Sequence, residues 1–157
     1  MPSANTLSIK PIREIFDWYS FGITVDPFAR NCELCEFTND LNPTTKAKSN
    51  MFALDFIISL PKMNFVVFDP PFTLRQVKEC YESVGAQFLK EDSQNAIRWS
   101  KERNAIAEKQ NKGDRVMSLG YTSVCMGKKR GYKILEICLV AHGPAHNDTI
   151  VTVEEKE

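Results

Sequence analysis

The chain has 157 residues, of which 43% are hydrophobic and 25% are charged, so it can bury one sizeable core and is too short to suggest two domains. Its 20 basic and 20 acidic residues cancel, which excludes a strong overall field for nucleic acid or membranes. The first ten residues show no export signal, and no stretch approaches the roughly 20 apolar residues of a membrane span. We therefore expect one domain over residues 1–157, soluble and cytoplasmic, with no membrane partner.

The predicted elements alternate between helices and strands along the chain. A helix is expected at 11–19, strands at 22–26, 36–40 and 47–51, a helix at 53–60 and a strand at 64–69. Helices follow at 73–84 and 92–111, and the last strands are expected at 115–121, 133–141 and 148–153. This alternation predicts an α/β fold, with a seven-stranded, mostly parallel sheet flanked by helices.

The cysteines and histidines do not form a convincing metal site. Five cysteines in a chain without an export signal favour reduced thiols. Cys32 and Cys35 form a lone CxxC pair, whereas zinc needs about four ligands. His142 and His146 flank Gly143-Pro144, which favours a hairpin turn between the last two strands over a helical metal motif. We therefore expect no metal.

Acidic residues end three of the predicted strands. Asp26 stands in "DPFARN", Asp40 in "NDLNP" and Asp69 in "DPPF". In an open α/β sheet, ligands bind beyond the carboxyl ends of the strands. These strand ends are therefore the candidate site.

In this order, the three motifs resemble those of the S-adenosylmethionine-dependent amino methyltransferases with a DPPF-type signature. The likeness is strongest to small adenine-specific DNA methyltransferases of phages and prophages, and it covers roughly residues 22–153. The resemblance implies a Rossmann-like class I methyltransferase fold with an antiparallel strand near the C-terminus. It also implies S-adenosylmethionine as cofactor and transfer of its methyl group to the exocyclic amino group of adenine in DNA.

The DPPF motif suits the chemistry of an amino group. The lone pair of an adenine amino nitrogen is conjugated into the ring, so two acceptors that hold its hydrogens make the nitrogen more nucleophilic. Asp69 can supply one acceptor and the Pro70 carbonyl the other, while neither Pro70 nor Pro71 has a competing N–H. Phe72 offers a ring on which a flipped-out base can stack. A plain strand end entering a helix is the alternative.

The resemblance also assigns residues to the cofactor. The loop after the first strand would hold its methionine part, and Asp40 would accept hydrogen bonds from the ribose, unless it only closes a turn. Phe52 stands where relatives have an aspartate that binds the adenine. The cofactor residues implied are Asp26, Phe28, Ala29, Asn31, Asp40, Phe52 and Ala53.

Three departures from the family pattern stand out. No glycine follows "DPF", the first crossover is truncated below the dozen or so residues that a helical connection needs, and Phe52 replaces an acid. No separate target-recognition domain is visible. Short loops or a second subunit in a homo-oligomer would therefore read the base sequence, or the sequence is not read at all. Lys128, Lys129 and Arg130 either bind nucleic-acid phosphates or form a solvated turn. An RNA or free-nucleobase methyltransferase, and a degenerate binding protein without catalysis, remain alternatives.

Overall fold

The computed structural model describes residues 6–96, 99–123, 125–144 and 146–157, and within them six strands form one sheet in the order β2-β1-β3-β4-β6-β5. The strands β2, β1, β3 and β4 run parallel to one another. Strand β6 runs antiparallel to its two neighbours, β4 and β5. This confirms the predicted α/β class, including the antiparallel strand near the C-terminus. The strands are β1 (Thr24–Asp26), β2 (Phe37–Thr38), β3 (Phe65–Phe68), β4 (Arg115–Gly120), β5 (Tyr132–Val140) and β6 (Thr149–Lys156).

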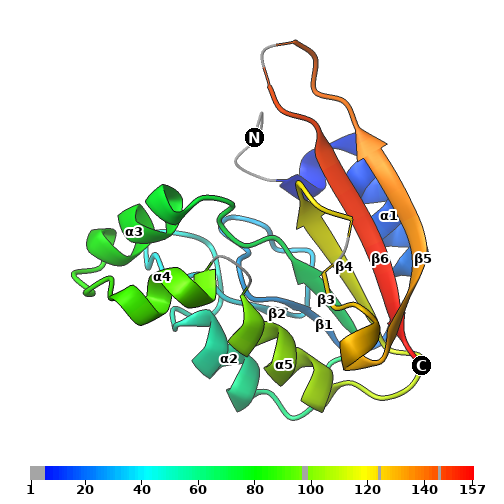
Figure 1. Ribbon diagram of the computed structural model, residues 1–157, viewed down its shortest axis with the longest axis horizontal. Helices are drawn as coiled ribbons and strands as arrows, with labels where there is room; N and C mark the ends of the chain where they lie inside the picture. The colour runs from blue at the N-terminus through cyan, green and yellow to red at the C-terminus, as the bar shows by residue number, and fades with distance from the viewer. Residues whose placement is uncertain (1–5, 97–98, 124, 145) are drawn as a thin grey trace.

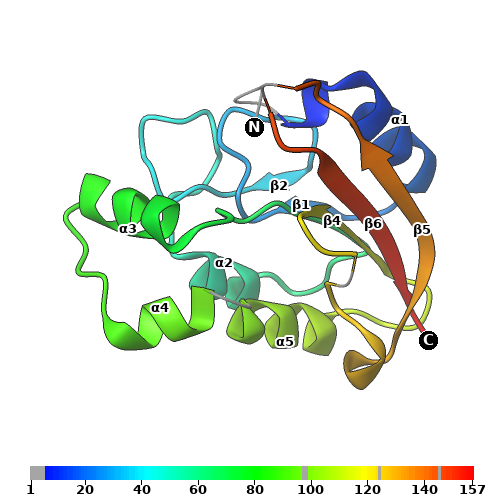
Figure 2. The same cartoon turned by 45° about the horizontal axis from the view of Figure 1, so that its top comes forward.

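Helices cover both faces of the sheet (Figures 1 and 2). The short helix η1 (Thr6–Ser8) and α1 (Lys10–Tyr19) lie on one face, and α2 (Ala53–Ser59) and α5 (Ser100–Lys109) lie on the other. Beyond the end of β3, at the left of Figure 1, are α3 (Leu74–Ser83) and α4 (Lys90–Ala96). A last short helix, η2 (Lys128–Arg130), precedes β5.

The apolar run of β3 forms the centre of two cores. All four of its residues are buried, and they alternate between the faces. Phe65 packs edge-on against Phe16 of α1, with ring centroids 5.7 Å apart, whereas Val66 and Phe68 belong to the core beneath α2 and α5. A strand covered on both faces reads as a continuous apolar run, and this places its carboxyl end, with Asp69, inside the molecule.

The first crossover is truncated as predicted. Residues 27–36 connect β1 to the parallel strand β2 without a helix. The stretch 47–51, which we expected to be a strand, makes one isolated parallel bridge, between Asn39 and Ser49. It therefore continues the sheet edge beyond β2 by a single residue pair within the described residues.

The helix predicted over 92–111 is wrong as a single element, because α4 and α5 replace it. Residues 97 and 98 lie outside the described residues. Trp99, which directly precedes α5, has φ 49°, a left-handed conformation that does not continue a right-handed helix. Its indole is buried and lies 5.1 Å from the ring of Phe28. The Asn95 side chain accepts a hydrogen bond from the Lys101 N–H at 3.1 Å, at the start of α5.

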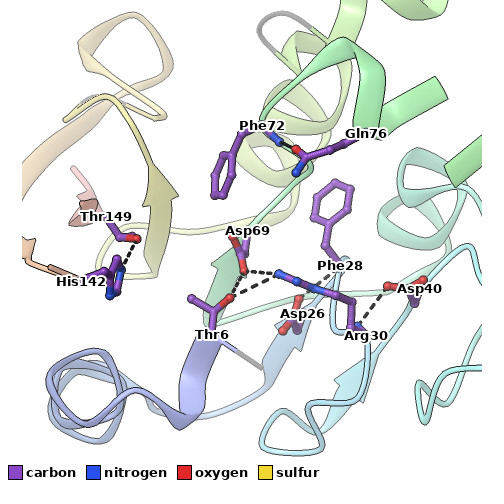
Figure 3. A network of polar contacts seen from close by, with 10 residues as sticks. All are labelled: Thr6, Asp26, Phe28, Arg30, Asp40, Asp69, Phe72, Gln76, His142 and Thr149. Carbon is purple, nitrogen blue, oxygen red and sulfur yellow. Dashed lines mark hydrogen bonds and ion pairs between the residues drawn. The ribbon is translucent and has the colours of Figure 1, made fainter. Parts of the chain in front are cut away.

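The predicted hairpin at the C-terminus is confirmed. Val140 of β5 pairs with Thr149 of β6, and the His142 ring nitrogen Nε2 lies 2.8 Å from Thr149 Oγ1 (Figure 3). Nowhere in the described ranges do three or more His, Cys, Asp or Glu side chains gather as metal ligands. None of the helices described has both the length and the apolar character needed to cross a membrane.

Candidate functional site

The three acids of the strand ends lie at one edge of the sheet, and Arg30 connects two of them (Figure 3). The backbone N–H of Arg30 donates to Asp40 Oδ2 at 3.0 Å. Its guanidinium Nη2 donates to Asp69 Oδ2, also at 3.0 Å. Parallel strands bring their carboxyl ends to the same edge, which explains why residues far apart in the sequence meet here.

Asp69 is buried and has one carboxylate oxygen with two partners and one with none. Its Oδ2 accepts hydrogen bonds from Thr6 Oγ1 at 2.7 Å and from Arg30. Its Oδ1 is buried and has no hydrogen-bond partner among the described residues. Burial raises the pKa of the Asp69 carboxyl, and the Arg30 charge opposes that rise. An acceptor left in this state costs roughly 1–3 kcal/mol, so Oδ1 is a buried acceptor with unused hydrogen-bonding capacity.

Phe72 is held in place from both sides. Its backbone N–H donates to Gln76 Oε1 at 3.0 Å, and Gln76 also forms a capping box with Thr73 at the start of α3. On the other side its ring centroid lies 5.0 Å from that of Tyr121. A Cβ at Gly120 would come within 3.4 Å of the ring. This is ordinary van der Waals contact, so the ring packs closely over the end of β4.

A cleft of about 940 Å³ opens beside these residues. Its walls come from the ends of β1, β2 and β3, from the start of α2, and from the α3, α4 and α5 region. This volume lies in the range of pockets that bind small molecules and cofactors. The residues of the predicted site that line it are Phe28, Asn31, Asp40, Phe52, Ala53, Asp69, Pro70, Pro71 and Phe72.

Asp26 and Ala29 lie beneath the cleft rather than in its wall. Together with Thr6 and Asp69 they line a separate cavity of about 10 Å³, room for about one water molecule. Asp26 Oδ1 accepts a hydrogen bond from the Phe28 backbone at 3.0 Å. Burial raises the pKa of Asp26 to about 8. At neutral pH this carboxyl is therefore mostly protonated and shapes the loop rather than acting as an anion.

Asp40 closes a turn and also faces the cleft. Its Oδ1 accepts from the Asn42 backbone at 2.9 Å, and its Oδ2 accepts from Arg30. The turn that we considered as an alternative is thus present. Because each carboxylate oxygen can accept more than one hydrogen bond, the turn leaves acceptor capacity toward the cleft.

Phe52 belongs to an aromatic group on the cleft wall. Its side chain is 40% exposed, and its ring lies 5.2 Å from that of Tyr81, which in turn lies 5.4 Å from Phe88. Tyr81 is thus shared between the packed interior and the wall. Phe52 presents an apolar ring where the family pattern has an acid.

Two residues that organise the site, Asn39 and Arg30, were missed from the sequence. The Asn39 side chain donates to the carbonyls of Pro27 (3.2 Å) and Met51 (3.0 Å), and it accepts from the Met51 N–H at 2.9 Å. It thereby joins three chain segments around the cleft. Its position directly before Asp40 was a usable signal. Arg30 adopts φ 51°, the conformation that a glycine would normally supply.

The basic cluster lies away from the cleft. Tyr132, just after η2, pairs with Lys156, and the neighbouring Glu155 pairs with Arg115 at the start of β4. Because Asp69 follows the end of β3, and β3 runs parallel to β4, η2 lies at the opposite end of the sheet. Arg130 Nε also donates to Asn104 Oδ1 at 2.8 Å. The structure therefore does not bring Lys128, Lys129 and Arg130 together with the other predicted site residues.

Comparison with known proteins finds solved structures of the same fold. No protein-family model matches the sequence, and no curated protein matches it significantly. Among solved structures, TrmN from Thermus thermophilus has a TM-score of 0.62 with 15% identity over 92% of this chain. The chain spans about half of that protein, 48% of its length.

Two further structures match over almost their whole length. A protein from Haemophilus influenzae provisionally described as a methylase has a TM-score of 0.53 and 11% identity, over 99% of this chain and 91% of its own. A protein from Escherichia coli provisionally described as a methyltransferase gives 0.55 and 12%, over 100% and 91%. The chain therefore shares the fold of these three proteins.

Proposed function

We propose that the protein transfers the methyl group of S-adenosylmethionine to the exocyclic amino group of an adenine base in DNA. The observation that carries this proposal is the Oδ1 of Asp69, directly after β3, which is buried and has no hydrogen-bond partner within the described ranges. This acceptor is followed by two residues without N–H groups and by an aromatic ring at the cleft. A strand end that only closed the fold would gain nothing from an unsatisfied carboxylate.

Asp69 and Pro70 act on the amino group through its two hydrogens. Asp69 Oδ1 and the Pro70 carbonyl accept hydrogen bonds from them, which draws electron density toward the nitrogen and stabilises the positive charge that develops as it attacks. The nitrogen–carbon bond would form as the methyl–sulfur bond breaks, the neutral thioether would leave, and the methylated nitrogen would then lose one proton to solvent. Phe72 holds the base by stacking. In Figure 3 its ring points toward the side of Asp69 away from Thr6. Thr6 and Arg30 hold the other carboxylate oxygen.

The cleft also suits the cofactor. Asp40 offers acceptors for ribose hydroxyls, Phe52 offers a ring for the adenine, and Phe28 and Asn31 face the same space. S-adenosylmethionine bound here would supply the methyl group as a sulfonium electrophile. Ala29 and Asp26 support the loop from beneath.

The charges around the cleft restrict how a nucleic acid can bind. Six acids and two bases line it. This balance favours a cationic cofactor and an uncharged base, and it disfavours phosphate groups. A DNA substrate would therefore insert only a flipped-out base. The charged lining residues are Arg30, Asp40, Asp55, Asp69, Glu79, Asp92, Lys101 and Glu102.

The same charge balance favours a second candidate substrate, a free adenine base or nucleoside. Such a substrate carries no phosphate, needs no flipping and makes no demand on the distant basic cluster. RNA would meet the same restriction as DNA. A non-catalytic role would leave Asp69 Oδ1 without a function.

The test is methyl transfer to single-stranded DNA, duplex DNA, RNA and adenosine, measured with labelled S-adenosylmethionine. We expect Asp69→Asn to lower turnover about a hundred- to a thousandfold and to leave cofactor affinity, measured by calorimetry, nearly unchanged. Asp17→Asn, which removes an exposed acid paired with Arg13 on α1, is the matched control. Wild-type protein that binds the cofactor but methylates none of these substrates would support the non-catalytic role. A folded Asp69→Asn as active as wild type would exclude the role given to Asp69.

A further inference from the structure

We propose that Arg30 is a positioning residue for Asp69, one that fixes the plane of its carboxylate and keeps it charged for the reacting amino group. This inference rests on the proposed methyl transfer. It adds a residue from a different strand end to the site, and it assigns a function to the loop in which glycine is missing.

The contacts of Arg30 determine which oxygen of Asp69 is left available. Nη2 of Arg30 lies 3.0 Å from Asp69 Oδ2 and 3.3 Å from Thr6 Oγ1, and Thr6 itself donates to the same oxygen at 2.7 Å. Two donors on Oδ2 hold the carboxylate plane, because rotation of the group would break both bonds. Oδ1 remains as the acceptor without a hydrogen-bond partner in the part of the chain that the structure describes.

The main chain of Arg30 is anchored as firmly as its side chain. Its N–H donates to Asp40 Oδ2 at 3.0 Å, and its left-handed φ of 51° turns the side chain back over the loop toward Asp69 (Figure 3). Because the anchor uses only the backbone, a side-chain substitution removes the contact with Asp69 and leaves the bond to Asp40 in place. The two functions of the residue can therefore be separated by mutation.

The charges around Asp69 show what Arg30 contributes electrostatically. Among the described residues, the titratable or charged groups around it are Arg30 on the loop after β1, Asp26 at the end of β1, Cys32 in the same small cavity, and Asp40 behind Arg30. Burial raises the pKa of Asp69, and Arg30 is the largest opposing influence. Without Arg30, Asp69 would keep its proton to a higher pH. A protonated carboxyl is a weaker acceptor, so turnover would fall at neutral pH and recover partly in alkali.

The first experiment is the pH dependence of turnover at saturating cofactor and substrate. Arg30→Gln and Arg30→Met remove the charge, Arg30→Lys keeps it without the planar fork, and Lys46→Gln removes an exposed cation paired with Glu33. We expect both neutral variants to lose about tenfold or more in turnover near neutral pH. The acidic limb of their pH–rate profile should move to higher pH by about one unit or more. Arg30→Lys should keep the limb near its wild-type position, and Lys46→Gln should match wild type throughout. A uniform loss at every pH, or a limb that does not move, overturns the proposal.

The second experiment does not depend on activity. Carboxyl ¹³C NMR titration, with Asp69→Asn used to assign the signal, gives the pKa of Asp69 in wild type and in each folded Arg30 variant. We expect that pKa to rise by about one unit or more in the neutral variants and to change little in Arg30→Lys. If wild type methylates no substrate, the proposed function fails and this titration still decides the role of Arg30. An unchanged pKa in the neutral variants overturns the role of Arg30 even if the enzyme is active.

Discussion

Asp26 gives the sharpest test of the electrostatics beneath the site, because its proton should control stability as a function of pH. Burial raises its pKa from the ordinary value of 3.8 to about 8. Between about pH 4 and pH 8 the folded protein holds this proton while the unfolded chain releases it, so the free energy of unfolding falls as pH rises. The difference of about four pH units corresponds to an upper limit of roughly 6 kcal/mol, at about 1.4 kcal/mol per unit.

The substitution Asp26→Asn should remove this dependence. An amide resembles the protonated acid and keeps an oxygen for the Phe28 N–H. We therefore expect the variant to match wild type below about pH 4, to exceed its stability increasingly as pH rises, and to exceed it by about 2–6 kcal/mol near pH 8.5. The assay is urea unfolding followed by circular dichroism across this range, with Asp17→Asn as the exposed control. If the difference in stability between variant and wild type stays the same from about pH 5 to 8.5, Asp26 is not protonated in the fold and the reasoning fails.

Two further predictions concern the opposite end of the sheet. Buried Glu154 accepts hydrogen bonds from three backbone N–H groups of residues 125–127. In urea unfolding, Glu154→Ala should lower the free energy of unfolding by about 3 kcal/mol or more, and Glu154→Gln should lower it less. A decrease below about 0.5 kcal/mol for Glu154→Ala would contradict this prediction. Reversing Lys128 and Lys129 to Glu should weaken binding of DNA at low salt and flatten its salt dependence, while methylation of adenosine stays at wild-type level. Anisotropy titrations that show no change would place the phosphate contacts elsewhere.

The parts of the fold that could be predicted are those that depend on short sequence patterns, such as hydrophobic spacing and the positions of proline and acidic residues. The apolar run at 64–69 predicted the strand that the structure shows as β3, and the acid at its end predicted a strand end at the candidate site. Pro11 and the apolar spacing from Ile12 predicted α1, which begins at Lys10. Such signals depend on neighbours in the sequence, and strand polarity then brings the ends of β1, β2 and β3 together.

What could not be predicted depends on contacts between distant residues. The sequence from 92 to 111 has helical composition throughout, whereas the start of α5 involves contacts between separate segments, the ring of Trp99 against Phe28 and the Asn95 side chain on the Lys101 N–H. The position of Lys128 to Arg130 depends on strand order and length, because the chain returns along the sheet before β5 begins. The sequence therefore could not show that this cluster lies at the end of the sheet opposite the candidate site.

The absence of glycine after "DPF" shows how a departure from a family pattern can be compensated in the fold. A left-handed conformation costs a non-glycine residue about 1–2 kcal/mol, and Arg30 adopts it. The hydrogen bonds that Arg30 donates to two carboxylates are charge-assisted, a kind of contact worth about 1.5–3 kcal/mol, which is enough to offset that cost even though its side chain is 38% exposed. The loop therefore keeps the turn that glycine would allow. It also gains a guanidinium that glycine could not supply, directed at the one acid whose free oxygen the proposed chemistry requires.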